Sequence, residues 1–232
     1  MPVFKERNGM NTVTVDAVID VVCPWCYLGK ARLDRAISAL EGDVEVVVQW
    51  RPFELDSTIP PEGVDNQAML AEKLGSPIRR DEMHQQLTNL GREEGITFNF
   101  DRILIRPNTL DAHRLLLWAH TESIAMQNVV VDRLYKANFE EGRNLGDHAV
   151  LADIAAECGM DREMVARLLA SDADIEVVRN EIANAEKMGV TGVPFFILNQ
   201  KYALSGAQPV EVLQNALQQL ATGDIGNGDG AA

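Results

Sequence analysis

The motif Cys23-Pro24-Trp25-Cys26 lies where a run of strand-forming residues changes into a helical pattern. This junction constrains the fold more than any other feature of the chain. Residues 12–22 are rich in Val, Ile and Thr, and their apolar density predicts a strand buried on both faces. Pro24 suits the first helical position because its φ is fixed and its missing N–H would have no helical partner there. We therefore expect Cys23 to be the N-cap of the helix that follows.

A second strand is predicted shortly after this helix. The helical pattern ends near Gly42, and residues 44–55 form another run of strand-forming residues that is closed by Pro60 and Pro61. Strand, helix and strand in about 45 residues make a βαβ unit, in which the two strands run parallel and the crossover is right-handed.

The middle of the chain has a helical character. Between residues 64 and 188 the periodicity is helical almost throughout, although residues 96–100 are strand-like. The predicted helices begin near Asn66, Pro77, Thr109, Asp147, Asp161 and Asp174, several with Asp or Thr placed as N-caps. This block predicts a helical subdomain, in which Trp118 is interpreted as a core residue, as is Trp50 in the preceding strand.

Extended structure returns after Gly189. Two short β-rich runs on either side of Asn199-Gln200 predict a hairpin, and Pro209 opens a last helix. The order βαβ, helical insertion, ββα predicts an α/β, thioredoxin-like fold with a large all-helical insertion. The predicted boundaries are 1–63 and 189–222 for the two thioredoxin-like halves, 64–188 for the insertion and 223–232 for a disordered, glycine-rich tail.

The two close cysteines predict redox chemistry. At a helix N-terminus the sulfur of Cys23 meets unpaired backbone N–H groups and the positive end of the helix dipole, which stabilise a thiolate. Cys26 lies one turn later on the same side, as a reversible disulfide requires. A structural zinc site would need four ligands, and of the three cysteines only Cys158 remains. The four histidines show no ligand spacing, so no metal is expected; Cys158 is interpreted as a small core residue.

Composition excludes several other classes of function. The chain has 21 Lys and Arg against 35 Asp and Glu, a formal charge of −14. An acidic surface of this kind repels phosphate and anionic lipid, so neither a nucleic acid nor a membrane is an expected partner. The first ten residues lack the apolar core and cleavage site of a secretory signal, and we therefore expect a cytoplasmic protein.

The sequence resembles the DsbA-like thioredoxin superfamily, and within it the cytosolic, FrnE-like branch. The matching segments are VIDVVCPWCYLGKARLDRA, PNTLDAHRLLLWA, LYKANFEEGRNLGDHAVLADIAAECGMD and MGVTGVPFFILNQKYALSGAQPVEVLQNAL. The resemblance implies a thiol-disulfide oxidoreductase in which Cys23 is the nucleophile, Cys26 the resolving thiol and Pro194 the cis-proline. The periplasmic DsbA oxidants carry Pro-His between the cysteines, so with Trp25 one charge that stabilises the thiolate is absent.

Five further residues are candidates for substrate binding. Trp25 offers apolar area beside the nucleophile, and the Val193 backbone is placed to pair with an extended substrate. Asp20 either tunes the thiolate or is an ordinary carboxylate at a strand end. The resemblance also places Asn108 and His113 beside the active site, although structural roles at a helix start and on a helix face are the simpler interpretations.

We therefore expect an oxidoreductase, with isomerase activity as an extension, that acts on protein or small-molecule disulfides and thiols. One alternative is a glutathione-dependent enzyme like the kappa-class transferases and 2-hydroxychromene-2-carboxylate isomerases, which typically carry Ser in place of Cys23. The other is a redox-regulated peptide-binding module without turnover. No bound cofactor is expected, since no glycine-rich nucleotide motif follows a strand, but glutathione is a candidate co-substrate.

Overall fold

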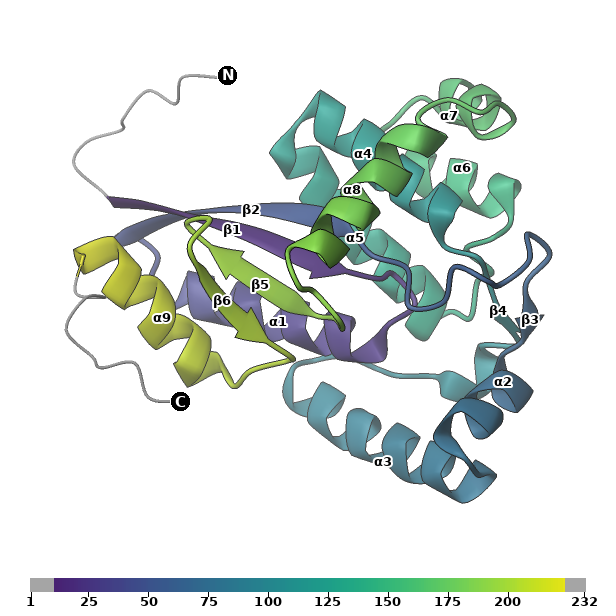
Figure 1. Ribbon diagram of the computed structural model, residues 1–232, viewed down its shortest axis with the longest axis horizontal. Helices are drawn as coiled ribbons and strands as arrows, with labels where there is room; N and C mark the ends of the chain where they lie inside the picture. Colours follow the sequence, from purple (N-terminus) through teal and green to yellow (C-terminus); the bar gives the residue numbers. More distant parts are fainter. Residues whose placement is uncertain (1–10, 224–232) are drawn as a thin grey trace.

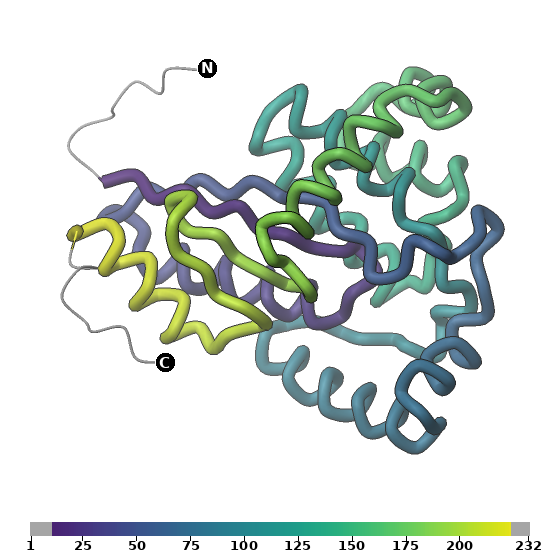
Figure 2. Tube along the Cα trace, in the orientation of Figure 1, coloured from purple at the N-terminus to yellow at the C-terminus, as the bar shows by residue number. Residues whose placement is uncertain are grey.

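A four-stranded sheet forms the centre of the molecule. The computed structural model describes residues 11–223, and its sheet has the strand order β2-β1-β5-β6. β1 (Asn11–Ile19) runs parallel to β2 (Val44–Pro52) and antiparallel to β5 (Phe195–Leu198), which in turn pairs antiparallel with β6 (Tyr202–Ser205). Segments from the two ends of the chain thus lie side by side in one sheet (Figure 2). The predicted thioredoxin-like order is confirmed.

Helices cover both faces of the sheet (Figure 1). α1 (Pro24–Ser38) and α9 (Val210–Thr222) pack together against one face, where the alternate β1 residues Val13, Val15, Ala17 and Ile19 join the main core. Val18 points to the opposite face and packs with Ala185 of α8. A strand covered in this way is apolar on both sides, which explains the dense apolar run in the sequence.

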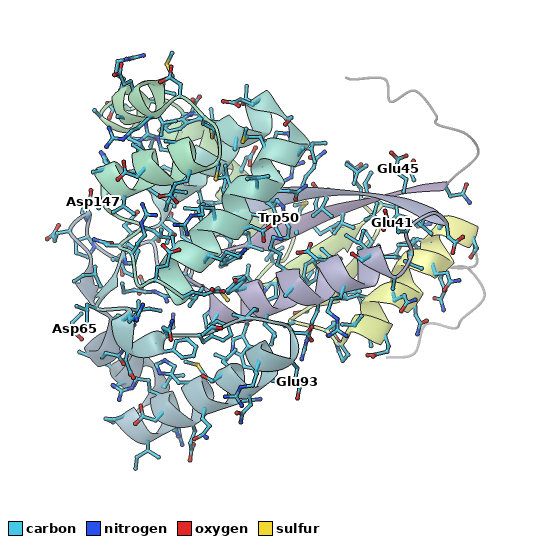
Figure 3. All side chains as sticks on the ribbon, turned by 180° about the vertical axis from the view of Figure 1, so that it is seen from behind. Glu41, Glu45, Trp50, Asp65, Glu93 and Asp147 are labelled. Carbon is cyan, nitrogen blue, oxygen red and sulfur yellow. The ribbon has the colours of Figure 1, made fainter. Side chains whose placement is uncertain are left out.

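The remaining elements come between β2 and β5 in the sequence. They are β3 (Val64–Asp65), α2 (Asn66–Leu74), α3 (Pro77–Glu93), a 3₁₀ turn (Phe100–Arg102), β4 (Ile105–Arg106), α4 (Leu110–Glu122), α5 (Ile124–Phe139), α6 (His148–Glu157), α7 (Arg162–Leu169) and α8 (Ile175–Lys187). They form two groups that project to opposite sides at one end of the sheet, α2–α3 and α4–α8 (Figure 1). Figure 3 shows Asp65 at the start of α2 in one group and Asp147 at the start of α6 in the other.

Stacked aromatic rings join α1 to the insertion. The ring of Tyr27 in α1 stacks on Tyr135 of α5, with centroids 5.0 Å apart, and also contacts Phe139 at 5.9 Å. Its edge-to-face partner is Phe98, at 5.8 Å. Aromatic pairs of this kind add about 0.5–1.5 kcal/mol each beyond their buried area. The cluster therefore fixes the N-terminal half of α1 against the inserted helices.

A buried amide closes the outer edge of the sheet. Gln127 of α5 accepts a hydrogen bond from the Trp50 N–H (3.1 Å) and donates one to the Trp50 carbonyl (3.0 Å). The pair satisfies backbone groups that an edge strand would otherwise leave open. Trp50 lies inside the molecule, between the sheet and the helices (Figure 3), and both it and Trp118 are buried, as the sequence predicted.

Two sequence predictions for the insertion are wrong in detail. The insertion is not all-helical, because β3 and β4 form a short antiparallel ladder. Residues 96–100 form no strand; Ile96, Phe98 and Phe100 are buried, and the Asn99 N–H donates to the Phe139 carbonyl of a helix end instead of a strand. Alternating apolar residues here fill the core without sheet pairing. Of the predicted tail at 223–232, residues 224–232 lie outside the described part of the chain.

Most predicted helix starts are confirmed. Asp65, Asp147 and Asp161 accept hydrogen bonds from the first turns of α2, α6 and α7. Asp174 precedes α8 without capping it, because its left-handed backbone (φ 60°) turns the side chain elsewhere. The sequence analysis did not separate α5 from α4; its N-cap, Ser123, was the available signal.

Gly29 of α1 packs directly on the loop that precedes β5. A Cβ atom at this position would lie 3.0 Å from Cγ of Pro194 and 3.4 Å from the Phe196 ring. We predict that Gly29→Val lowers the free energy of unfolding, measured by urea denaturation, by about 1–3 kcal/mol. Gly192→Ala is the matched control, since a Cβ there meets no atom within 4 Å and the change should be below about 0.5 kcal/mol. Equal effects of the two substitutions would contradict the packing argument.

Candidate functional site

The sulfur of Cys23 sits at the N-terminus of α1. Cys23 is the N-cap of this helix, with an extended backbone (φ −92°, ψ 111°), and Pro24 begins the helix. The Cys26 N–H donates to Sγ of Cys23 at 3.3 Å. This hydrogen bond and the helix dipole both favour negative charge on the sulfur. The predicted N-cap position of Cys23 is confirmed.

A loop from the other end of the sequence faces this sulfur. The Val193–Pro194 peptide bond is cis, and Sγ of Cys23 lies 3.7 Å from the Val193 carbonyl oxygen. The Gly206 N–H donates to the Pro194 carbonyl at 2.8 Å, which ties the loop to the end of β6. The nucleophilic sulfur and the loop backbone thus border the same space.

The two cysteines differ in their surroundings. Cys23 is 3% exposed and Cys26 is 0% exposed, and both are free thiols. Burial, and then the hydrogen bond with Cys23, raise the pKa of the Cys26 thiol well above its ordinary value. Cys26 therefore stays protonated at neutral pH while Cys23 is the sulfur that borders a pocket. This asymmetry fits attack by Cys23 and resolution by Cys26.

Asp20 is a buried carboxylate behind the cysteine turn. It is 1% exposed, and it accepts hydrogen bonds from the Leu55 N–H (2.9 Å) and the Val22 N–H (3.4 Å). Burial raises the pKa of this carboxyl, but His113, the charge of Arg106 and the Leu55 N–H together outweigh burial and leave the pKa below its ordinary value. Asp20 is therefore ionised at neutral pH.

His113 of α4 bridges Asp20 and the chain after β2. Its Nε2 lies 3.0 Å from the Phe53 carbonyl oxygen and 3.6 Å from Oδ1 of Asp20. Because a carbonyl oxygen only accepts hydrogen bonds, Nε2 carries the hydrogen. The buried Nδ1 has no hydrogen-bond partner among the described residues. His113 thereby fixes the insertion against the strand that leads to Cys23.

Tyr135 of α5 reaches the underside of the cysteine turn. Its hydroxyl donates to the Asp20 carbonyl at 3.4 Å and lies close enough to the two cysteines for their charges to affect its pKa. Burial, followed by the nearby charges of Cys26 and Cys23, raises the pKa of the phenol well above its ordinary value. A phenol that stays protonated is a hydrogen-bond donor, so Tyr135 is placed to stabilise negative charge on the Cys26 sulfur when it forms.

A pocket of about 220 Å³ opens beside Cys23. Its walls come from the start of α1, from α2 and α3, and from the segment around β4, with Val193 at one side. Trp25, Leu70 and Phe139 contribute to its mainly apolar surface. Arg106 and Lys73 also line it. The nucleophilic sulfur therefore stands at the edge of a mainly apolar pocket suited to a small substrate.

The pocket separates the five candidate substrate-binding residues into two groups. Trp25 and Val193 line the pocket, as expected of residues that touch a substrate. Asp20, Asn108 and His113 do not line it. Asn108 instead accepts from the Leu110 N–H (3.0 Å) and donates to the Ile59 carbonyl (2.9 Å), which holds the start of α4. The contacts of these three residues hold neighbouring parts of the chain in place. Direct contact with a substrate stays a prediction for them, and their position outside the pocket lining does not favour it.

Sequence reasoning missed Arg106, Lys73 and Tyr135. Arg106 stands in an apolar stretch directly before Pro107, and a lone cation in such a setting was an available signal. Tyr135 carried no signal, because an aromatic residue on a helix is usually a core residue. Cys158 ends α6 and is half-buried rather than a core residue, with its sulfur 3.9 Å from the Val129 carbonyl.

Two negative observations concern residues 11–223. This part of the chain contains no group of three or more His, Cys, Asp or Glu side chains that could hold a metal ion. It also contains no helix that is long and apolar enough to cross a membrane.

Residues 14–218 match the family model described as the DSBA-like thioredoxin domain. The chain therefore belongs to the DsbA-like thioredoxin family, which confirms the resemblance seen in the sequence. Among solved structures, a probable DsbA oxidoreductase from Streptomyces coelicolor is 33% identical, with a TM-score of 0.84 and 94% of each chain covered. Family and neighbours support an oxidoreductase of the thiol-disulfide class.

Two further proteins are similar to the chain at lower sequence identity. The YwbO protein of Bacillus subtilis (strain 168), described as uncharacterized, is 26% identical over 207 residues, which are 89% of this chain and 96% of YwbO. The cytosolic disulfide reductase DsbM from Pseudomonas aeruginosa, solved with GSH, shares the fold with a TM-score of 0.63 at 20% identity. That comparison covers 89% of this chain and 98% of DsbM.

The lowered pKa of Asp20 predicts a pH-dependent stability. A carboxyl whose pKa is lower in the folded state stabilises the fold above its unfolded-state pKa of about 3.9, and this contribution is lost as the pH falls through the lower, folded-state pKa. We expect Asp20→Asn to lower the free energy of unfolding by about 1–3 kcal/mol at neutral pH. The difference from the wild type should shrink as the pH falls below about 4.

Urea denaturation of both proteins across this pH range measures the effect. Asp153→Asn is the control, because the Asp153–Arg162 ion pair is exposed and should contribute less than about 0.5 kcal/mol. A deficit of Asp20→Asn that stays constant down to low pH would show that the ionised carboxylate is not its source.

Proposed function

We propose that this protein exchanges disulfides through Cys23 and Cys26 by a mixed-disulfide mechanism, acting on protein or small-molecule disulfides. The observation that carries the proposal is the position of the Cys23 sulfur. It accepts a hydrogen bond from the Cys26 N–H, and it borders both the Val193–Pro194 loop and an open pocket. A thiolate at a helix N-terminus with a resolving thiol one turn away can attack, and then release, a bound disulfide.

The reaction has two steps in the reducing direction. The Cys23 thiolate attacks one sulfur of the substrate disulfide, the substrate S–S bond breaks, and one substrate thiolate leaves. Cys26 then loses its proton and attacks the Cys23 sulfur, which releases the second substrate thiolate and leaves a Cys23–Cys26 disulfide. The protein dithiol is oxidised by two electrons and the substrate is reduced by two; the reverse sequence oxidises a substrate dithiol.

The residues around the cysteines support these steps. The Val193 backbone faces the space where an extended substrate would lie beside the Cys23 sulfur. The Tyr135 hydroxyl lies beside Cys26, and on turning from the Asp20 carbonyl it can donate to the thiolate that forms before the second attack. Asp20 accepts from the Val22 N–H just before the turn and from the Leu55 N–H after β2, and His113 contacts the Phe53 carbonyl after β2, so together they position the turn.

Glutathione dependence is the second candidate. DsbM, which shares the fold, was solved with GSH, and the pocket beside Cys23 contains two cationic side chains that could bind carboxylates. Calorimetry with reduced glutathione tests this candidate directly. The absence of binding at millimolar ligand would remove it, whereas the exchange reaction itself would be unaffected.

Three further expectations belong to the same proposal. A cytoplasmic location, isomerase activity and the absence of a bound cofactor remain predictions from the sequence.

The third candidate, a redox-regulated peptide-binding module, would keep its peptide binding and its suppression of aggregation after Cys23→Ser. Loss of both in that variant would count against it.

Cysteine substitutions test the exchange mechanism. With insulin disulfides as substrate and dithiothreitol as reductant, Cys23→Ser should lower the rate of catalysed reduction by more than about 100-fold, because the attacking sulfur is missing. When the reduced Cys26→Ser variant is mixed with insulin in the absence of dithiothreitol, it should retain the attack and accumulate a mixed disulfide at Cys23 that mass spectrometry detects.

Cys158→Ser is the matched control and should retain the wild-type rate, since Cys158 lies at the end of α6, away from the pocket lining. Undiminished turnover in Cys23→Ser would sink the proposed function.

A further inference from the structure

The lining of the Cys23 pocket has an unusual charge. The chain has 35 acidic residues against 21 Lys and Arg, yet no Asp or Glu lines this pocket. Its ionisable side chains other than Cys23 are Lys73, His84 and Arg106. In an acidic protein, an apolar pocket with cations alone on its walls attracts anions in preference to cations or neutral molecules.

Asp20 and Asp56, two carboxylates on whose pKa Arg106 acts, lie outside the pocket lining. The charge of Asp20 acts on Arg106, but its carboxylate oxygens accept from the Leu55 and Val22 N–H groups, behind the cysteine turn. Asp56 is half-buried; its carboxylate accepts from the Thr58 N–H and hydroxyl, and Lys73 and Arg106 are among the charges that lower its pKa. Neither carboxylate forms an ion pair within 4.0 Å with Arg106 or Lys73 in the described part of the chain.

Arg106 is built into the wall but is not fully satisfied. It is only 8% exposed, and its Nη1 donates to the Val22 carbonyl, one residue before Cys23, at 2.8 Å. Its Nε is buried without a hydrogen-bond partner among the described residues. A guanidinium offers donors in a planar fork that matches a carboxylate. The hydrogen bond to the Val22 carbonyl therefore holds the guanidinium beside Cys23, while the Nε–H of Arg106 still lacks an acceptor among the described residues.

His84 is a second incompletely satisfied group on the same wall. Its ring stacks on Phe100, with centroids 4.0 Å apart, and its buried Nε2 has no partner among the described residues. Burial, and then the charge of Arg80, lower the pKa of His84, so the ring is neutral at pH 7 and lends a polar atom without adding charge. Two of the pocket's polar side chains, Arg106 and His84, thus each have one nitrogen atom without a hydrogen-bond partner among the described residues.

We propose that the Cys23 pocket takes low-molecular-weight disulfides and thiols that combine an apolar, aromatic-sized body with an acidic group. The acidic group binds Arg106 and Lys73, and the apolar body packs on Trp25, Leu70 and Phe139 while its sulfur meets Cys23. This inference rests on the proposed function and names its substrate class. Glutathione disulfide matches less well, because its body is polar and its ammonium groups find no carboxylate on the pocket wall.

Dithiobis(nitrobenzoate) is a suitable probe, since each of its rings carries a carboxylate beside the disulfide. The Cys23 thiolate attacks one sulfur and releases a first nitrothiobenzoate. Cys26 then loses its proton and displaces the second, so the protein dithiol becomes a disulfide and one probe disulfide becomes two coloured thiolates. Neutral dithiodipyridine undergoes the same exchange without the charge.

The experiment compares the stopped-flow rates of the reduced protein with the two probes. Each rate is divided by that of 2-mercaptoethanol with the same probe, which removes the intrinsic reactivity of the probe. We expect this normalised preference for the anionic probe to exceed about tenfold and to fall with added salt. Lys73→Gln and Arg106→Gln should each lower the preference by about 3–10-fold, mainly through the anionic probe.

Three variants separate the charge from other effects. Lys187→Gln removes an exposed cation away from the pocket lining and should leave the preference unchanged. Arg106→Lys keeps the charge and should retain most of the preference for the anionic probe. Leu70→Glu adds an acid to the wall and leaves Arg106 intact, so its loss of preference does not depend on whether Arg106→Gln folds.

The outcomes distinguish this inference from the proposed function. A normalised preference near one in the wild type, or equal losses with both probes in the pocket variants, would overturn the substrate class alone. Failure of the wild type to react with either probe would overturn the exchange function as well.

Discussion

The contact between the start of α1 and the loop before β5 is the constraint on which the rest of the structure depends. The sulfur of Cys23 accepts from the Cys26 N–H, and the Val193 carbonyl closes the other side at 3.7 Å. Gly29 allows Pro194 to approach the helix, because any larger residue would place a Cβ 3.0 Å from the proline ring. Two segments about 170 residues apart meet only because β1 and β5 are neighbours in one sheet. The insertion between them must therefore leave and return at the same end of the sheet.

The insertion in turn contributes to the site on both sides of the cysteine turn. Behind the cysteine turn, Asp20, His113 and Tyr135 form a buried polar group whose hydrogen bonds hold the turn and lie next to Cys26. A buried charge needs hydrogen bonds and nearby opposite charge, which the Leu55 N–H and the charge of Arg106 provide for Asp20. In front, α2, α3 and the β4 segment form the pocket, and Arg106 joins the two regions through its bond to Val22. The insertion thus both holds the reactive cysteine turn and forms the pocket for the substrate.

The sequence was informative wherever a local pattern determines structure. The order of elements along the chain, the N-cap at Cys23 and most helix starts follow from strand and cap signals that act over a few residues. The strand predicted at residues 96–100 failed because alternation reports burial, and here Phe98 and Phe100 are buried in an aromatic cluster rather than in a sheet. The pocket could not be predicted, since Lys73 and Arg106 lie 33 positions apart and their meeting depends on how α2 packs beside β4. Tyr135 was missed for the same reason: its contact with Cys26 spans more than a hundred residues.

The central claim is that Cys23 and Cys26 form a reversible, redox-active couple. Its most direct test is the reduction potential of the pair, measured by equilibration in glutathione redox buffers, alkylation of free thiols and peptide mapping. The account predicts a Cys23–Cys26 disulfide with a potential between about −120 and −270 mV, the range spanned by DsbA and thioredoxin, while Cys158 is alkylated throughout. Absence of this disulfide, or a potential below about −300 mV, which is typical of structural bonds, would contradict it.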